Sequence, residues 1–124
     1  KLADLERGAV NFGSVWNVDA AMRKNICYAH EHENPSHLFF LGSMYKDDFW
    51  AIGGNDEDFT APGFEDKYLG DIIKRKYKVN WRDDIVGLHQ NHARPKNLRA
   101  VVEPSRIIYE EKMKNFEQTI ERLK

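Results

Sequence analysis

The clearest hydrophobic pattern lies near the C-terminus. Apolar residues recur there at spacings of 4, 3, 4 and 3, at Tyr109, Met113, Phe116, Ile120 and Leu123. Such spacing places side chains on one face of an α-helix. We predict a long C-terminal helix from Ser105, the expected N-cap, to Lys124, within a C-terminal unit of residues 101–124. Its apolar stripe is expected to pack on its own domain or on a missing one; the alternative is that it pairs two chains into a dimer through a short coiled coil.

A second apolar stripe predicts a helix in the middle of the chain. It consists of Phe64, Tyr68, Leu69, Ile72 and Ile73, and Lys74, Arg75 and Lys76 follow it. The basic residues suit the C-terminal end of a helix, where the helix dipole favours positive charge. A shorter helix is expected over residues 46–52, ended by the pair Gly53–Gly54.

The remaining segments have weaker patterns. The aromatic-rich residues 37–45 predict a buried strand, and residues 78–81 and 84–88 predict two short strands. Residues 55–62 and 90–105 are expected to be irregular. Residues 1–36 show no sustained period and are predicted to be irregular, with a loop over residues 27–36.

Together these elements predict a mixed fold, an α/β or α+β fragment, in three parts. An irregular segment of residues 1–36 precedes a central region of residues 37–100 and the helix of residues 101–124. A chain of 124 residues that is 41% hydrophobic is large enough for one domain at most and can form a core.

Charge and cysteine content exclude several classes of protein. There are 19 basic and 20 acidic side chains, so no basic excess indicates a nucleic-acid partner. No apolar run approaches the roughly 18 residues of a transmembrane helix. The single cysteine, Cys27, has no partner for an internal disulfide, and we expect a reducing compartment and an inert thiol.

Two adjacent carboxylates are the first candidates for chemistry. Glu65 and Asp66 fall in the first turn of the predicted central helix, where free N–H groups stabilise negative charge. One interpretation is that they are ordinary helix-start residues. The other is that one carboxylate binds the substrate while the other acts as general base, which is possible because neighbouring helical side chains diverge by about 100°. A dipole-stabilised carboxylate is expected to be a weak base.

Histidines are the second candidates. His89 and His92 follow a predicted strand, and either is a candidate metal ligand or an ordinary surface side chain. The pair His30 and His32 lies in a predicted loop without an evident partner. The Asp56–Asp58 segment contains an Asp-x-Asp pattern, which we interpret as ordinary loop residues.

Three motifs together resemble a known enzyme family. The segment Phe49–Phe59, FWAIGGNDEDF, is similar to the IGGFDExF segment of GT-A glycosyltransferases, and Gly63–Asp66 matches the end of their GWGxED motif. His89 resembles their metal-binding histidine. The order and spacing are closest to galactosyltransferase-like and chondroitin-polymerase-like enzymes, over roughly residues 37–97. The family's Gly-Trp is replaced by Ala61–Pro62.

The resemblance implies a role for each matching residue. Asp66 would be the catalytic base, and Glu65, with Phe64 and Gly63, would bind the acceptor. His89, or else His92, would hold a divalent cation, Mn²⁺ or Mg²⁺, on the diphosphate of the donor. The donor would be a nucleotide sugar, and the acceptor a carbohydrate or glycolipid.

The same resemblance predicts the context of the chain. It implies the C-terminal, acceptor-side part of an inverting bacterial polysaccharide-synthesising enzyme in the cytoplasm, peripheral to the inner membrane face. The nucleotide-binding half is expected upstream, and the chain is expected to be inactive without it. The alternative is a non-catalytic α+β binding module. A hydrolase ranks last, because adjacent carboxylates do not easily flank a glycosidic bond at about 5 Å or more.

Overall fold

The computed structural model describes residues 3–33, 35, 39 and 41–123. Within these residues, four strands and four helices follow one another as β1 (Ala9–Val18), β2 (Lys24–Ala29), β3 (Gly42–Ser43), α1 (Lys46–Ala51), α2 (Glu65–Lys76), β4 (Lys78–Gln90), α3 (Leu98–Met113) and α4 (Phe116–Arg122). The chain is therefore a small mixed α/β domain, as the sequence predicted.

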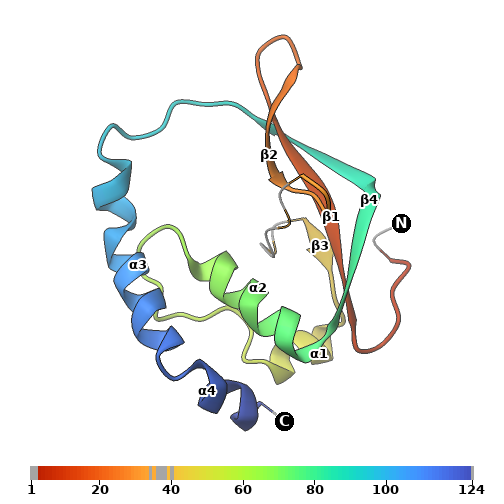
Figure 1. Cartoon of the computed structure of the whole chain (residues 1–124), viewed down its shortest axis with the longest axis vertical. Helices are drawn as coiled ribbons and strands as arrows, with labels where there is room; N and C mark the ends of the chain where they lie inside the picture. The colour runs from red at the N-terminus through yellow and green to blue at the C-terminus, as the bar shows by residue number, and fades with distance from the viewer. Residues whose placement is uncertain (1–2, 34, 36–38, 40, 124) are drawn as a thin grey trace.

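Strand β1 is the centre of a mixed sheet. It pairs in parallel with β4 along its whole length, and on its other side it is antiparallel to β2 and to the short β3. Helix α2 lies between the sheet and the helices α3 and α4, and the segment 91–97 connects the end of β4 to α3 at the far side of the molecule (Figure 1). The sheet and α2 thus enclose the core.

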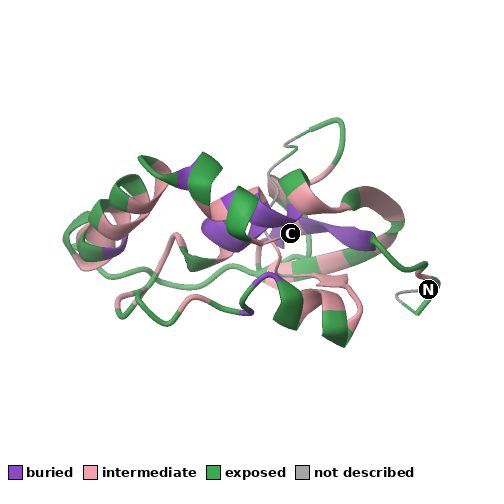
Figure 2. Ribbon diagram, turned by 90° about the horizontal axis from the view of Figure 1, so that it is seen from below, coloured by how far each residue is buried: buried purple, intermediate pink, exposed green. Residues whose placement is uncertain are grey.

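The core lies where β1 meets α2 (Figure 2). Nearly every β1 residue is buried. Because apolar burial is the main favourable term in folding, this contact organises the domain. The buried cluster consists of Val10, Phe12, Ile52, Tyr68, Leu69, Ile72, Ile73, Phe116 and Ile120.

The two strongest helical patterns led to correct predictions of where apolar helix faces pack. The α2 stripe faces the core. Helix α1 ends at Ala51, shortly before Gly53 and Gly54, which adopt φ of 93° and 65°. The stripe of the C-terminal region also packs on this core, through Phe116 and Ile120, which is the first of the two alternatives stated for it. Dimer formation through this stripe stays a prediction.

The predicted start of the C-terminal helix was wrong. Helix α3 begins at Leu98, contains Pro104 and Ser105, and is separated from α4 at Lys114 and Asn115. The irregular segment predicted for residues 90–105 is therefore limited to residues 91–97. Ser105 is fully buried inside α3 and is not an N-cap.

The prediction of an irregular N-terminal segment over residues 1–36 was also wrong. Strands β1 and β2 occupy residues 9–18 and 24–29, so Cys27 lies in a strand. The two strands predicted over 78–81 and 84–88 are one strand, β4. In the predicted strand of residues 37–45, only Gly42 and Ser43 form a strand, and His37, Leu38 and Phe40 lie outside the described residues.

Candidate functional site

A strained turn leads into α2. Gly63 and Phe64 have φ of 91° and 68°, so two successive residues adopt left-handed conformations. Glycine does so freely, but a bulky side chain such as that of Phe64 pays about 1–3 kcal/mol, and such strain is concentrated at functional sites. The turn directs Glu65 and Asp66 into the first turn of the helix.

Helix α3 holds this turn in place. The Ser105 hydroxyl donates a hydrogen bond of 2.6 Å to the carbonyl oxygen of Ala61. The ring of Phe64 lies 5.4 Å from that of Tyr109, measured between centroids. The sequence pattern predicted that Ser105 is a helix N-cap, because a serine that precedes an apolar stripe is typical of the start of a helix. Its contact with Ala61 depends on tertiary packing.

We expect Ser105→Ala to lower the free energy of unfolding by about 1–3 kcal/mol, because it leaves a partly buried carbonyl oxygen without its donor. Urea unfolding at equilibrium measures this difference. The exposed neighbour of the turn, Thr60, supplies the control Thr60→Ala, which should stay within about 0.5 kcal/mol of the parent. Equal unfolding midpoints for Ser105→Ala and the parent would contradict the bracing role.

Asp66 is half-buried at the start of α2, whereas Glu65 is exposed. The Oδ1 of Asp66 accepts a hydrogen bond of 2.8 Å from the Lys67 backbone N–H. Burial raises the pKa of Asp66, the neighbouring Glu65 charge raises it further, and backbone N–H groups partly oppose the rise. Asp66 is therefore a stronger base than an exposed aspartate, and the expectation of a weak, dipole-stabilised base is corrected.

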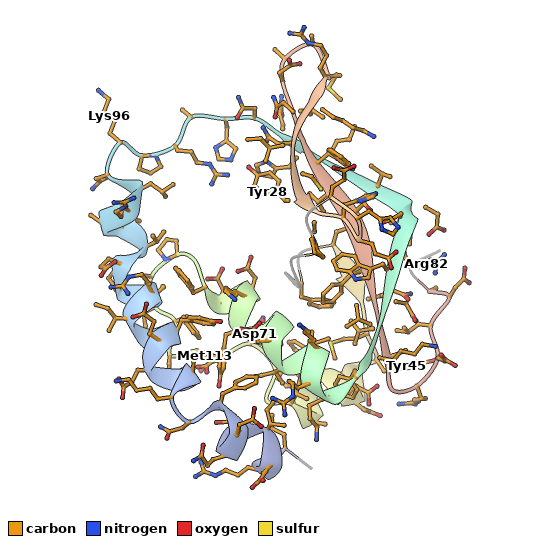
Figure 3. The ribbon with its side chains drawn as sticks, in the orientation of Figure 1. Tyr28, Tyr45, Asp71, Arg82, Lys96 and Met113 are labelled. Carbon is orange, nitrogen blue, oxygen red and sulfur yellow. The ribbon has the colours of Figure 1, made fainter. Side chains whose placement is uncertain are left out.

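A polar network joins the start of α2 to α3. The Tyr109 hydroxyl donates a hydrogen bond of 2.6 Å to Asp71, and Lys67 Nζ lies 3.6 Å from the same carboxylate oxygen. Asp71 lies on α2, which runs beside α3 with its Met113 (Figure 3). This network fixes the helix that carries Asp66, and nothing in the sequence pattern marked it.

His89 lies near the end of β4 with its ring oriented by a neighbouring strand. Its Nδ1 is 3.0 Å from Asn17 Oδ1, and the amide of Asn17 in turn donates a 3.0 Å hydrogen bond to Asn25 Oδ1. Because the Asn25 contact directs the amide nitrogen away, Asn17 presents its oxygen to His89. An Nδ1–H donor leaves the Nε2 lone pair available for a ligand.

The two predicted histidines are neighbours. The ring centroids of His89 and His92 are 5.3 Å apart, and the ring centroid of Tyr28 lies 5.2 Å from that of His89. His92 is exposed. A hollow of about 220 Å³ beside His89 is lined by Val15, Leu41, Gly87 and Leu88. The residues fit a divalent cation in part, because two imidazoles from this side would leave most positions of the ion open.

The carboxylates and the histidines lie on different elements. Contacts of the Asp66 region run to α3, whereas those of His89 run to β1 and β2. Within the described ranges, no hydrogen bond or ion pair joins Asp66 to either histidine. Only segment 91–97 links the end of β4 to α3 along the chain (Figure 1). The two groups are thus separate in this structure.

The Asp-x-Asp pattern has a structural use. Lys112 Nζ contacts Asp56 at 2.9 Å and Asp58 at 2.6 Å, which ties the loop before α2 to α3. A hollow of about 370 Å³ near this loop includes Trp50, Asp56 and Tyr68 but neither Asp66 nor a histidine. The interpretation of Asp56–Asp58 as loop residues agrees with these contacts. The prediction of an unreactive Cys27 thiol is consistent with its raised pKa, which results first from burial and then from the charge of Glu33.

Comparisons of the chain with protein-family models, with curated proteins and with solved structures found no match. No helix in the described part of the chain is long and apolar enough to cross a membrane.

Proposed function

We propose that this chain is the acceptor-side portion of an inverting, metal-dependent glycosyltransferase that uses a nucleotide-sugar donor. The observation that supports it best is Asp66, a half-buried carboxylate with a raised pKa at the start of α2, beside the exposed Glu65. A base is most effective when its pKa approaches the working pH, and burial moves Asp66 in that direction. The strained Gly63–Phe64 turn is consistent with a functional site.

In the proposed reaction, Asp66 removes the proton from an acceptor hydroxyl as the oxygen attacks the anomeric carbon. The new glycosidic bond forms on the face opposite to the departing diphosphate, so the configuration inverts, and the bonding pair of the broken C–O bond leaves with the diphosphate. Glu65 accepts a hydrogen bond from a second acceptor hydroxyl. Because the acceptor's proton passes to the Asp66 carboxylate, the oxygen of the new glycosidic bond is left uncharged.

A divalent cation, Mn²⁺ or Mg²⁺, would neutralise the charge of the departing diphosphate. His89 would bind it through Nε2, since Asn17 holds Nδ1, and His92 lies close enough to assist. An imidazole ligand favours Mn²⁺ over Mg²⁺. The orienting contact from Asn17 fits the general need of a metal-binding histidine for a partner on its second nitrogen.

The second candidate function is a non-catalytic α+β binding module. One contact favours it: Asp66 accepts a hydrogen bond from the Lys67 N–H, which is a common arrangement at the start of a helix. In that case Asp66 stabilises the start of α2 and takes part in no reaction. The two candidates differ in whether the protein turns over a nucleotide sugar.

The test is release of nucleoside diphosphate from a panel of nucleotide sugars, with oligosaccharide and glycolipid acceptors and Mn²⁺. It uses the full natural polypeptide in which these residues occur. We expect acceptor-dependent release that a chelator abolishes. No release with any donor and acceptor, from protein whose folding is verified by circular dichroism, would favour the binding module.

His89→Gln is expected to raise the Mn²⁺ concentration needed for half-maximal turnover roughly 10–100-fold, a typical result when support of a metal site is lost. Titration of activity with Mn²⁺ measures it. The exposed neighbour Gln90 supplies the control Gln90→Ala, whose Mn²⁺ requirement should equal that of the parent. An unchanged requirement in His89→Gln would remove His89 from the proposed site.

A further inference from the structure

The pair His30 and His32 follows β2, and the fold brings a carboxylate to it. In the parallel pairing of β1 with β4, Gly13 aligns with Arg82 but Ser14 aligns with Val86. Three residues of β4, from Asp83 to Ile85, therefore bulge out of register. Bulges re-aim side chains, and this one places Asp83 beside the residues that follow β2.

Asp83 is held in this position from two sides. The fully buried Ser14 hydroxyl donates a hydrogen bond of 2.6 Å to its Oδ1. His30 Nε2 lies 3.5 Å from its Oδ2, while the His32 backbone N–H donates to His30 Nδ1. An Nδ1 that accepts requires the proton of neutral His30 to be on Nε2, which faces the carboxylate. Asp83 is thus oriented in the way that partners orient a metal-binding carboxylate.

Glu31 and His32 complete a mixed group around Asp83. One ligand atom from each of Glu31, His32 and Asp83 lies within 4.8 Å of the other two, and His32 Nε2 is 3.7 Å from a Glu31 carboxylate oxygen. Ligand atoms of a tetrahedral zinc with bonds near 2.1 Å are about 3.4 Å apart. Because Glu31 and His32 are exposed, their side chains can rotate through the remaining distance.

We propose that Glu31, His32 and Asp83 form a binding site for a divalent transition-metal ion of the zinc type. One imidazole and two carboxylates form a ligand set that zinc accepts, and the fourth position is left to water. His30 is a positioning residue, whose Nε2 faces the Asp83 carboxylate at 3.5 Å. The bound ion fastens the segment after β2 to the bulge of β4.

This site is separate from the candidate transferase site. Side chains alternate between the faces of a strand, so Ser14, which holds Asp83, and Asn17, which holds His89, point to opposite faces of the sheet. A Zn²⁺ site here neither requires nor supports the transfer reaction. Loss of one set of properties leaves the other unchanged.

The test is titration of the whole chain with Zn²⁺ alone, followed by calorimetry and by the ring NMR signals of the histidines. We expect the His32 ring signals to respond to Zn²⁺, and Asp83→Asn and His32→Gln each to weaken this binding at least tenfold. Asp83→Asn keeps an oxygen that accepts from Ser14, and His32 is exposed, so both variants should fold. The midpoint of thermal unfolding should rise with Zn²⁺ in the parent and less in either variant.

Matched controls separate this site from its neighbours. Asp84→Asn removes the adjacent exposed carboxylate, which pairs with Arg82, and His92→Gln removes an exposed histidine that lies beside His89. Both should keep Zn²⁺ affinity at the His32 signals within twofold of the parent. Unchanged affinity in Asp83→Asn and His32→Gln, or a loss confined to His92→Gln, would overturn the proposal.

Discussion

Asp66→Asn is expected to lower the rate of sugar transfer by roughly 10²–10⁴-fold, the usual contribution of a general base. The amide has nearly the shape of the carboxylate and keeps an oxygen that can accept from the Lys67 N–H, but it cannot take a proton from the acceptor. The turnover number for diphosphate release, measured at saturating donor and acceptor, shows the effect. Donor binding should stay at the level of the parent.

The control carboxylate is Asp47, which also lies in the first turn of a helix, α1, but is 84% exposed. Asp47→Asn removes the same charge from an equivalent helical position and should leave transfer unchanged. Transfer at the parental rate in Asp66→Asn, or an equal loss in both variants, would end the role proposed for Asp66. A folded Asp66→Asn variant without turnover supports that role over the binding module.

The stability of Asp66→Asn should also differ from that of an ordinary variant. The pKa of Asp66 is raised in the folded chain, first by burial and then by Glu65. The stability that this carboxyl contributes is therefore present below its unfolded pKa, about 3.9, and is lost as the pH rises through the higher folded value. The uncharged asparagine avoids that loss. The free energy of unfolding of the variant, relative to that of the parent, should therefore be higher at pH 7 than at pH 3. Urea unfolding at both pH values measures this difference.

Phe12→Ala is expected to lower the free energy of unfolding by about 3–5 kcal/mol, because it removes a large ring from a packed core. Phe12 is 1% exposed and lies at the centre of β1, with its ring centroid 5.5 Å from that of Trp81 and 5.8 Å from that of Phe39. The free energy of unfolding of a typical domain is only about 5–15 kcal/mol in total. Equilibrium unfolding in urea, with circular dichroism as the signal, measures the loss.

The apolar residue Ile107 provides the control for Phe12. It lies on α3 and is 54% exposed, so Ile107→Ala should change stability by no more than about 0.5 kcal/mol. A cost below about 1 kcal/mol for Phe12→Ala would show that β1 is not the centre of the core.

The helices α1 and α2 and the apolar stripe of the C-terminal region could be predicted from the sequence. Their patterns are local: side chains three and four positions apart meet on one helix face, and Gly53 and Gly54 mark the end of α1. The position of Glu65 and Asp66 in the first turn of α2 was predicted for the same reason.

Strand β1 could not be predicted in this way, because it is buried on both faces and so shows no alternation. It also carries Asn11, Ser14 and Asn17, which are typical of loops. These polar side chains are tolerated in the interior because each has a partner elsewhere in the chain: Asp4 and Ser43 for Asn11, Asp83 for Ser14, and Asn25 for Asn17.

By itself, the sequence determined the mixed composition of the fold, its local helices and the identity of the candidate carboxylates and histidines, because these depend on neighbours along the chain. Only the tertiary structure decided how those residues are used. It braced the Asp66 turn through Ser105, occupied Asp56 and Asp58 with Lys112, and brought Asp83 to His30 and His32. Each of these contacts joins residues more than 40 positions apart, and no local pattern records such a pairing.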